Sequence, residues 1–155
     1  MRAVVQRVLE ARVEVGAEIV GAIGAGLLAY VGFGRGDTPR DRTWTISKIA
    51  TLRIFEHEGK MARALEDVGG SLLVVSQFTL YADVRRGRRP SFDDAMPPEQ
   101  ASVAYDAFVA EARGLLGARV ATGRFGAAMR VRSVNDGPVT IWLDSGALDR
   151  GGTDV

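Results

Sequence analysis

The chain has 155 residues, of which 46% are hydrophobic, and its 20 basic side chains nearly balance 19 acidic ones. This composition predicts one globular domain with a hydrophobic core, and it excludes a polycation. The chain has no cysteine and one histidine, His57. A thiol nucleophile and a cysteine-ligated zinc site are therefore excluded, a histidine-ligated metal is disfavoured, and we expect neither a metal ion nor a cofactor.

The chain begins directly with an alternating segment, without the apolar stretch of a signal peptide. No apolar run approaches the ~18 residues that a membrane helix needs. We therefore expect a soluble, cytoplasmic protein that does not bind membranes.

Residues 2–15 alternate valines with charged side chains, which predicts a β-strand. Residues 19–23 are expected to return beside it as a hairpin, and the apolar run 27–33 predicts a central strand. A helix is expected to begin at Thr38, with Pro39 at the first helical position and Asp41 completing a capping box. Ile46, Ile49 and Ala50 continue this helix, and Arg53 is expected in its last turn.

In the second half, residues 71–81 form the most strand-like stretch of the chain. A second helix is expected from Pro97 to about Gly117, followed by two separate strands over residues 129–134 and 139–143. We expect one domain over residues 1–144, with an α+β fold in which two helices cover a β-rich sheet or partial barrel. Residues 145–155, rich in glycine and aspartate, are expected to form a flexible C-terminal tail.

Two short polar segments, residues 76–80 and 135–140, stand where strands are expected to end. Ser76 and Thr79 are either polar residues at a strand end or part of a site, where backbone N–H groups would bind an oxyanion better than a bare hydroxyl would attack. The segment with Gly137 and Pro138 is either a plain turn or a device that presents bare carbonyl groups to a neighbouring site.

Four arginines, Arg85, Arg86, Arg88 and Arg89, lie within one loop. They form either a solvated loop or a phosphate-binding surface, and the near-neutral chain favours a local footprint on RNA over a general coat on DNA. Two other patterns are set aside. Residues 24–29 match a dinucleotide-binding fingerprint but run into the strand expected over residues 27–33, where the fingerprint needs a helix. His57 stands on a polar turn with no nucleophile to serve.

Several segments in a fixed order resemble the bacterial-type D-aminoacyl-tRNA deacylases, from residue 1 to about residue 143. Each segment alone is a weak signal, whereas the ordered set is specific. The segments are Gln6-Arg7-Val8, Gly69-Gly70-Ser71, Ser76-Gln77-Phe78-Thr79, Arg89-Pro90-Ser91-Phe92, Thr122-Gly123-Arg124-Phe125-Gly126 and Asn135-Asp136-Gly137-Pro138-Val139-Thr140.

The resemblance implies a homodimer with active sites at the subunit interface, whose substrate is aminoacylated tRNA and whose products are free D-amino acid and tRNA. It implies a cis Gly137–Pro138 bond that reaches into the partner's site and rejects L-amino acids. Glycine lacks a side chain, so glycyl-tRNA, including glycine mischarged on alanine tRNA, is expected to be cleaved as well. The implied catalytic pocket is formed by Ser76, Gln77, Phe78 and Thr79, supported by Arg7, Phe125 and Met129, while Arg85, Arg86, Arg88 and Arg89 contact tRNA.

Within this resemblance, two hydrolytic routes remain open. In one, backbone N–H groups near Phe78 and Thr79 bind the oxyanion while the ribose 2′-hydroxyl assists water; in the other, Thr79 is a covalent nucleophile. The alternative functions are an L-alanyl-tRNA deacylase with a trans Gly137–Pro138 bond and a non-catalytic tRNA-binding module. Arg7 favours the D-specific group.

Overall fold

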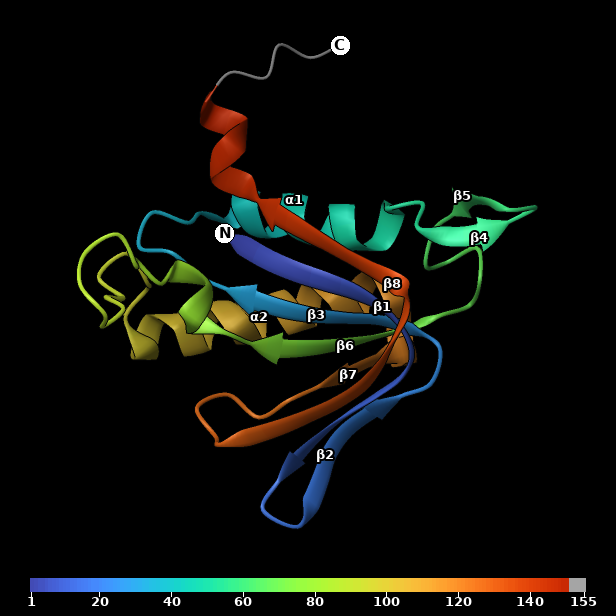
Figure 1. The fold of residues 1–155 in the computed structure, drawn as a ribbon, viewed down its shortest axis with the longest axis horizontal. Coiled ribbons are helices and arrows are strands. Elements are labelled where there is room, and N and C mark those ends of the chain that lie inside the picture. Colours follow the sequence, from blue (N-terminus) through green and yellow to red (C-terminus); the bar gives the residue numbers. More distant parts are fainter. Residues whose placement is uncertain (151–155) are drawn as a thin grey trace.

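The computed structural model of the protein describes the backbone of residues 1–150 and the side chains up to Ala147. Its centre is a 6-stranded sheet in the order β2-β1-β3-β6-β7, with β8 paired to β1 as well (Figure 1). The strands are β1 (Arg2–Val15), β2 (Glu18–Ile23), β3 (Gly26–Gly32), β6 (Ser71–Ser76), β7 (Val120–Thr122) and β8 (Met129–Asp144). A separate hairpin consists of β4 (Phe55–His57) and β5 (Lys60–Arg63).

The helices are α1 (Pro39–Thr51) and α2 (Pro98–Leu116), with short 3₁₀ turns η1 (Phe78–Tyr81), η2 (Gly117–Arg119) and η3 (Ser145–Arg150). At the start of α1, the Thr38 N–H donates to Asp41 Oδ2 at 2.8 Å, as the capping pattern predicts. At the end of α2, Gly117 takes a φ of 62°, which favours glycine.

The long strand β1 organises the sheet. Its first half pairs antiparallel with β3 on one side and with the end of β8 on the other, and its second half pairs with β2 and the start of β8. Strands β3, β6 and β7 run parallel, joined through the helices. All parallel strands of this group therefore end at the same edge of the sheet.

The sheet curls until its two outer strands nearly meet. At Gly21 of β2, an added Cβ would lie 2.2 Å from the carbonyl oxygen of Thr122 in β7, so only glycine permits this approach. This closure confirms the expected α+β fold with a partial barrel.

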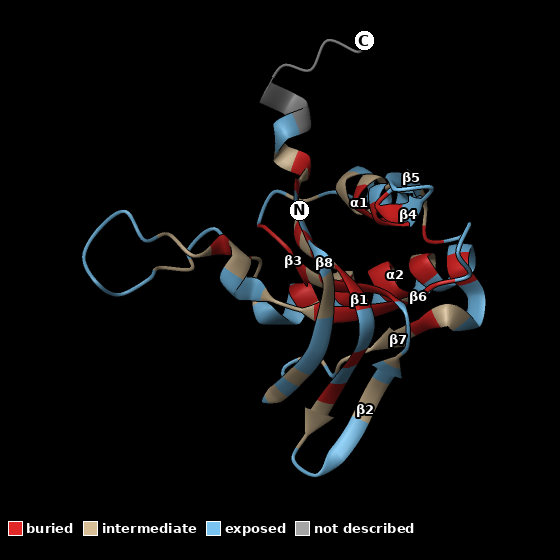
Figure 2. Cartoon of the chain, turned by 45° about the vertical axis from the view of Figure 1, so that its right-hand side comes forward, coloured by how far each residue is buried: buried red, intermediate tan, exposed pale blue. Residues whose placement is uncertain are grey.

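Two apolar clusters fill the molecule. The larger lies between the sheet and the two helices, where Phe108 and Leu27 are fully buried (Figure 2). The smaller lies inside the curled sheet and includes Val13 and Leu73. Helix α2 is also fastened by Tyr105, whose hydroxyl donates to the carbonyl of Val74 at 2.9 Å. Burial raises the pKa of Tyr105, so the hydroxyl keeps its proton.

The structure differs from the expected elements in four places. Residues 129–143 are not two strands but part of the single strand β8, whose register against β1 shifts around Val8. Strand β6 ends at Ser76, and the chain turns into η1, because β3 beside it ends at Gly32. Helix α1 ends at Thr51, so Arg53 lies beyond its last turn. Strand β7 was not anticipated, because three residues carry no clear alternation.

Ser145 is buried and begins η3, whereas residues 151–155 of the expected tail lie outside the described residues. Within residues 1–150, neither helix has the length and apolar content to span a bilayer.

Candidate active site

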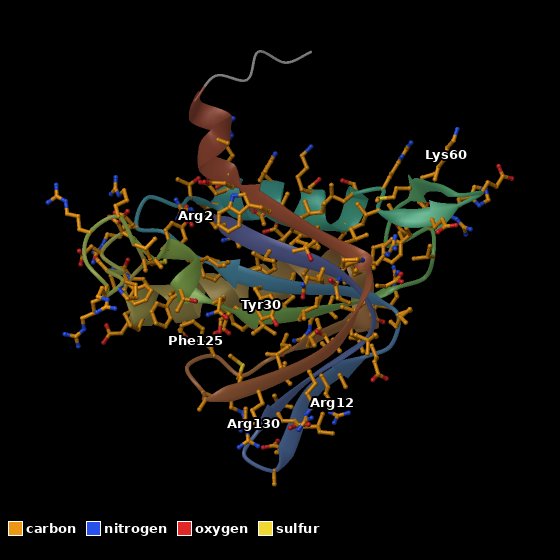
Figure 3. The ribbon with its side chains drawn as sticks, viewed as in Figure 1. Arg2, Arg12, Tyr30, Lys60, Phe125 and Arg130 are labelled. Carbon is orange, nitrogen blue, oxygen red and sulfur yellow. The ribbon has the colours of Figure 1, made fainter. Side chains whose placement is uncertain are left out.

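A pocket of about 680 Å³ opens at the edge of the sheet where β3 and β6 end. The pocket brings Ser76, Gln77 and Phe78 together with Phe125 and Met129, five of the predicted pocket residues. Figure 3 places Phe125 at this edge, near the end of β6. Sequence segments about fifty residues apart therefore meet at one site, as expected for the carboxyl ends of parallel strands.

The polar segment leaves the sheet through one last main-chain contact. The Gln77 N–H donates to the Val31 carbonyl at 2.8 Å, after which η1 begins. The N–H groups of Phe78 and Thr79 come first in this turn, and no acceptor for them is found among the described residues. The segment therefore offers two free main-chain donors where β6 ends, one of them on Phe78, which lines the pocket.

Thr79 is exposed and does not line the pocket. Its hydroxyl accepts a hydrogen bond from the Gln77 side-chain amide. No carboxylate, histidine or lysine contacts this hydroxyl among the described residues, so nothing there is placed to remove its proton.

The rim of the pocket is aromatic. Phe78 is 57% exposed and meets Phe92 edge to face, with ring centroids 4.9 Å apart. Phe125 packs against Tyr105, which ties the opposite wall to α2. Phe92 was not assigned a role from the sequence, although it stands in one of the segments that carry the resemblance. The exposed ring of Phe78, supported by the partly buried Phe92, can receive a flat ligand by stacking.

Gly137 and Pro138 do not line this pocket. They are exposed on β8, close to Val8 of β1. Across the sheet from there, Arg7 of β1 pairs with Leu27 of β3, and Leu27 pairs with Leu72 of β6. Leu72 precedes Ser76 by four residues, so this turn lies on the order of 13 Å along the sheet from the pocket of its own chain. The Gly137–Pro138 peptide bond is cis, the isomer that the resemblance implies.

Arg7 is 9% exposed and lies under this turn. Its Nε is 2.8 Å from Asp136 Oδ2 in an ion pair whose angle at the N–H is poor for a hydrogen bond. Its Nη1 donates to the carbonyl of Ile54 at 2.5 Å. Arg7 is therefore held from both sides, and it belongs to the turn and not to the pocket.

The arginine loop, residues 84–90, is exposed and projects beyond the body of the molecule (Figure 2). Arg85 is bound by Asp83 through Nε at 2.9 Å and Nη2 at 2.7 Å, and these hydrogen bonds lower the pKa of Asp83 to about 2. Arg86, Arg88 and Arg89 form no ion pair with any described residue. Three of the four arginines thus have unpaired charge.

Two further features lie away from the pocket. His57 is exposed in the β4–β5 hairpin, with Nδ1 3.0 Å from Arg63 Nη2, and Figure 3 shows Lys60 projecting away from the same hairpin. A second hollow of about 490 Å³ surrounds the Met1 ammonium group, which is bound by Asp37 and Ser145. Among residues 1–150, no group of three or more potential ligands is arranged to hold a metal ion.

The fold and the site define a single-domain α+β protein with a partial barrel, a mostly apolar pocket whose polar lining includes Ser76 and Gln77, and a separate Gly-Pro turn. The family model described as D-Tyr-tRNA(Tyr) deacylase matches residues 4–144. A D-aminoacyl-tRNA deacylase from Roseiflexus sp. (strain RS-1) is 62% identical over 146 residues, which is 94% of each chain. The chain belongs to this deacylase family.

Two solved structures share the fold. One, titled c-Myc DNA Unwinding Element Binding Protein, is 43% identical with a TM-score of 0.89, over 93% of this chain and 98% of that chain. The other, titled a probable eukaryotic D-amino acid tRNA deacylase, has a TM-score of 0.80 over 92% of this chain and 97% of that chain. Its 21% identity supports the fold alone.

Proposed function

We propose that the protein hydrolyses the ester bond of D-aminoacyl-tRNA and releases free D-amino acid and tRNA in the cytoplasm. The observation that carries this proposal is the convergence of Ser76, Gln77 and Phe78 with Phe125 and Met129 around one pocket, in a chain of the deacylase family. The pocket is large enough for a terminal adenosine, and its exposed aromatic rim suits a nucleobase.

The hydrolytic step uses water. Water adds to the ester carbonyl carbon, the bond to the ribose oxygen breaks, and that oxygen takes the proton that water loses. The free N–H groups of Phe78 and Thr79 bind the negative charge on the carbonyl oxygen. The ribose 2′-hydroxyl orients the water, since no side chain at the pocket is placed as a general base. The Thr79 hydroxyl, held by Gln77, supports the turn and does not attack.

Rejection of L-amino acids is assigned to Gly137 and Pro138 of a second copy of the chain. This turn is exposed and lies away from its own pocket, so it acts only if it enters the pocket of another protomer. Exposed apolar side chains beside it, Leu9 at 57% and Val134 at 45%, support a homodimer through this face. An L side chain would collide with the main-chain carbonyls, while a D side chain would point away.

Transfer RNA is bound through its phosphates by the arginine loop. Arg86, Arg88 and Arg89 carry the contact because their charges are unpaired, whereas Arg85 shapes the loop through Asp83. Arginine suits this role because its planar fork matches phosphate oxygens.

The deciding experiment measures deacylation of D-tyrosyl-tRNA and L-tyrosyl-tRNA by the purified protein, with and without a chelator. We expect rapid loss of the D ester only, with no effect of the chelator, and slower cleavage of glycyl-tRNA. Resistance of glycyl-tRNA at high enzyme concentration would contradict a filter that acts on side chains.

Two competing functions give different results in the same assay. A tRNA-binding module would bind tRNA in a salt-dependent way without cleaving either tyrosyl ester. An L-alanyl-tRNA deacylase would cleave L-alanyl-tRNA and leave D-tyrosyl-tRNA intact.

A further inference from the structure

The side chain of Asn135, two residues before Gly137, binds the main chain of β1 and of the segment that follows the Gly137–Pro138 turn. The Asn135 side-chain amide donates to the carbonyl of Arg7 at 2.9 Å and to the carbonyl of Val139 at 3.1 Å. One amide group thereby ties β1 to the strand that continues after the turn. Both contacts use N–H donors, which an aspartate at this position could not supply.

Asp136 holds the turn from a second direction. Its carboxylate pairs with Arg7, whose guanidinium is nearly buried, while the Ile54 carbonyl accepts from the other end of that guanidinium. A Cβ added to Gly137 would lie 3.0 Å from Arg7 Nη2, so the guanidinium packs directly against the turn. Removing Asp136 would leave a buried cation short of a partner, with freedom to move.

The irregular pairing of β8 with β1 explains why the turn needs the side-chain contacts of Asn135 and Asp136. The pairing of β1 with β8 is irregular between Gln6 and Glu10, so the regular ladder does not hold the turn on its own. Side-chain contacts from Asn135 and Asp136 replace the missing ladder at the place where the chain leaves regular strand geometry.

We propose that Asn135 and Asp136 are positioning residues that determine stereochemical selectivity by fixing the carbonyl groups of Gly137 and Pro138. This inference rests on the proposed function, because it assigns these residues to the filter described there. Rejection by collision requires a rigid obstacle, since a displacement of about 0.5 Å is enough to disturb a constrained site. The two residues therefore act on selectivity through the turn and do not touch the substrate.

The test uses the full-length variants Asn135→Ala and Asp136→Ala, with Asn135→Asp as a variant of nearly equal size and Asp136→Glu as a conservative rescue. Asp106→Ala, an exposed aspartate on α2, is the matched control. The first readout is the ratio of kcat/KM for L-tyrosyl-tRNA to that for D-tyrosyl-tRNA. The second is backbone hydrogen exchange of the segment 137–140, measured by mass spectrometry.

We expect the L-to-D ratio to rise about tenfold in each alanine variant, from the loss of one or two hydrogen bonds or an ion pair. Exchange over 137–140 should become faster, Asp136→Glu should restore part of the selectivity, and Asp106→Ala should match the wild type. An unchanged ratio together with unchanged exchange would overturn the inference. If the wild type cleaves neither ester, the proposed function is refuted, and exchange over 137–140 alone then decides whether the two residues hold the turn.

Discussion

At the scale of single residues, the site relies on main chain more than on ionisable side chains. Ser76 and Gln77 are half-buried, and the N–H groups of Phe78 and Thr79 in η1 have no acceptor among the described residues. This arrangement suits a reaction in which the substrate supplies the water-activating group, since only the charge on the carbonyl oxygen then needs protein stabilisation. Thr79 then has one of two roles: its backbone N–H binds the oxyanion, or its hydroxyl attacks the ester.

Replacement of Thr79 by alanine should leave deacylation of D-tyrosyl-tRNA within about tenfold of the wild type. The reason is that the backbone donor remains when the side chain is removed, whereas loss of a covalent nucleophile typically costs ~10⁴-fold or more. Single-turnover rates at saturating enzyme measure the chemical step directly. A loss of four orders of magnitude in a folded variant would establish Thr79 as the nucleophile.

At the scale of elements, the helices and the arginine loop are organised by short-range charge contacts. Partial burial raises the pKa of Asp41, but hydrogen bonds from Ser145 and Thr38 outweigh this effect and lower the pKa to about 2. Asp41 thus links the start of α1 to the beginning of η3. At the arginine loop, Arg85 forms an equally local ion pair with Asp83, which directly precedes the loop.

The Asp41 contact should make the protein sensitive to acid. Because the pKa in the folded state is depressed, the stabilisation is present above the unfolded pKa of about 4 and is lost as pH falls towards 2. We expect the thermal midpoint of the wild type to fall more steeply between pH 4 and pH 2 than that of Asp41→Asn. Asp106→Asn is the control, and parallel curves for Asp41→Asn and the wild type would contradict the assignment.

The arginine loop should give unequal effects on tRNA affinity. Arg86→Ala, Arg88→Ala and Arg89→Ala should each reduce the slope of log K against log salt by about 1, because each removes one phosphate contact. Arg85→Ala should reduce it less, since Asp83 already pairs with this side chain. Fluorescence anisotropy with labelled tRNA at several salt concentrations measures these slopes. Equal slopes for all four variants and the wild type would exclude the loop from the tRNA interface.

At the scale of the whole molecule, the two parts of the proposed site lie apart on one chain. The pocket is at the edge where β3 and β6 end, whereas the Gly137–Pro138 turn is beside Val8, farther along the sheet. A dimer is the simplest arrangement that brings the pocket of one chain together with the Gly137–Pro138 turn of another. It would also cover the apolar side chains that β1 and β8 expose.

Val134→Glu should therefore separate the proposed dimer and remove its selectivity. The variant places a carboxylate in the proposed interface, where burial without a partner is costly. Sedimentation velocity should give the mass of a single 16.6 kDa chain, and the discrimination between D- and L-tyrosyl-tRNA should be lost. Val103→Glu, at a 70% exposed site on α2, should remain dimeric and selective. A dimeric, fully selective Val134→Glu protein would refute this interface.

The sequence by itself determined the α+β class, the long first strand, both helix starts and the order of the segments that identify the family. These features depend on local periodicity, on capping residues such as Thr38 and on motif spacing. Only the tertiary structure decided that β6 ends at Ser76, that β8 is one strand with a shifted register, and that Phe92 joins the rim. It also decided that Asn135 and Asp136 hold Arg7 and the turn. Those outcomes depend on which strands lie side by side and where a neighbouring strand ends, and such contacts between distant segments leave no periodic trace in the sequence.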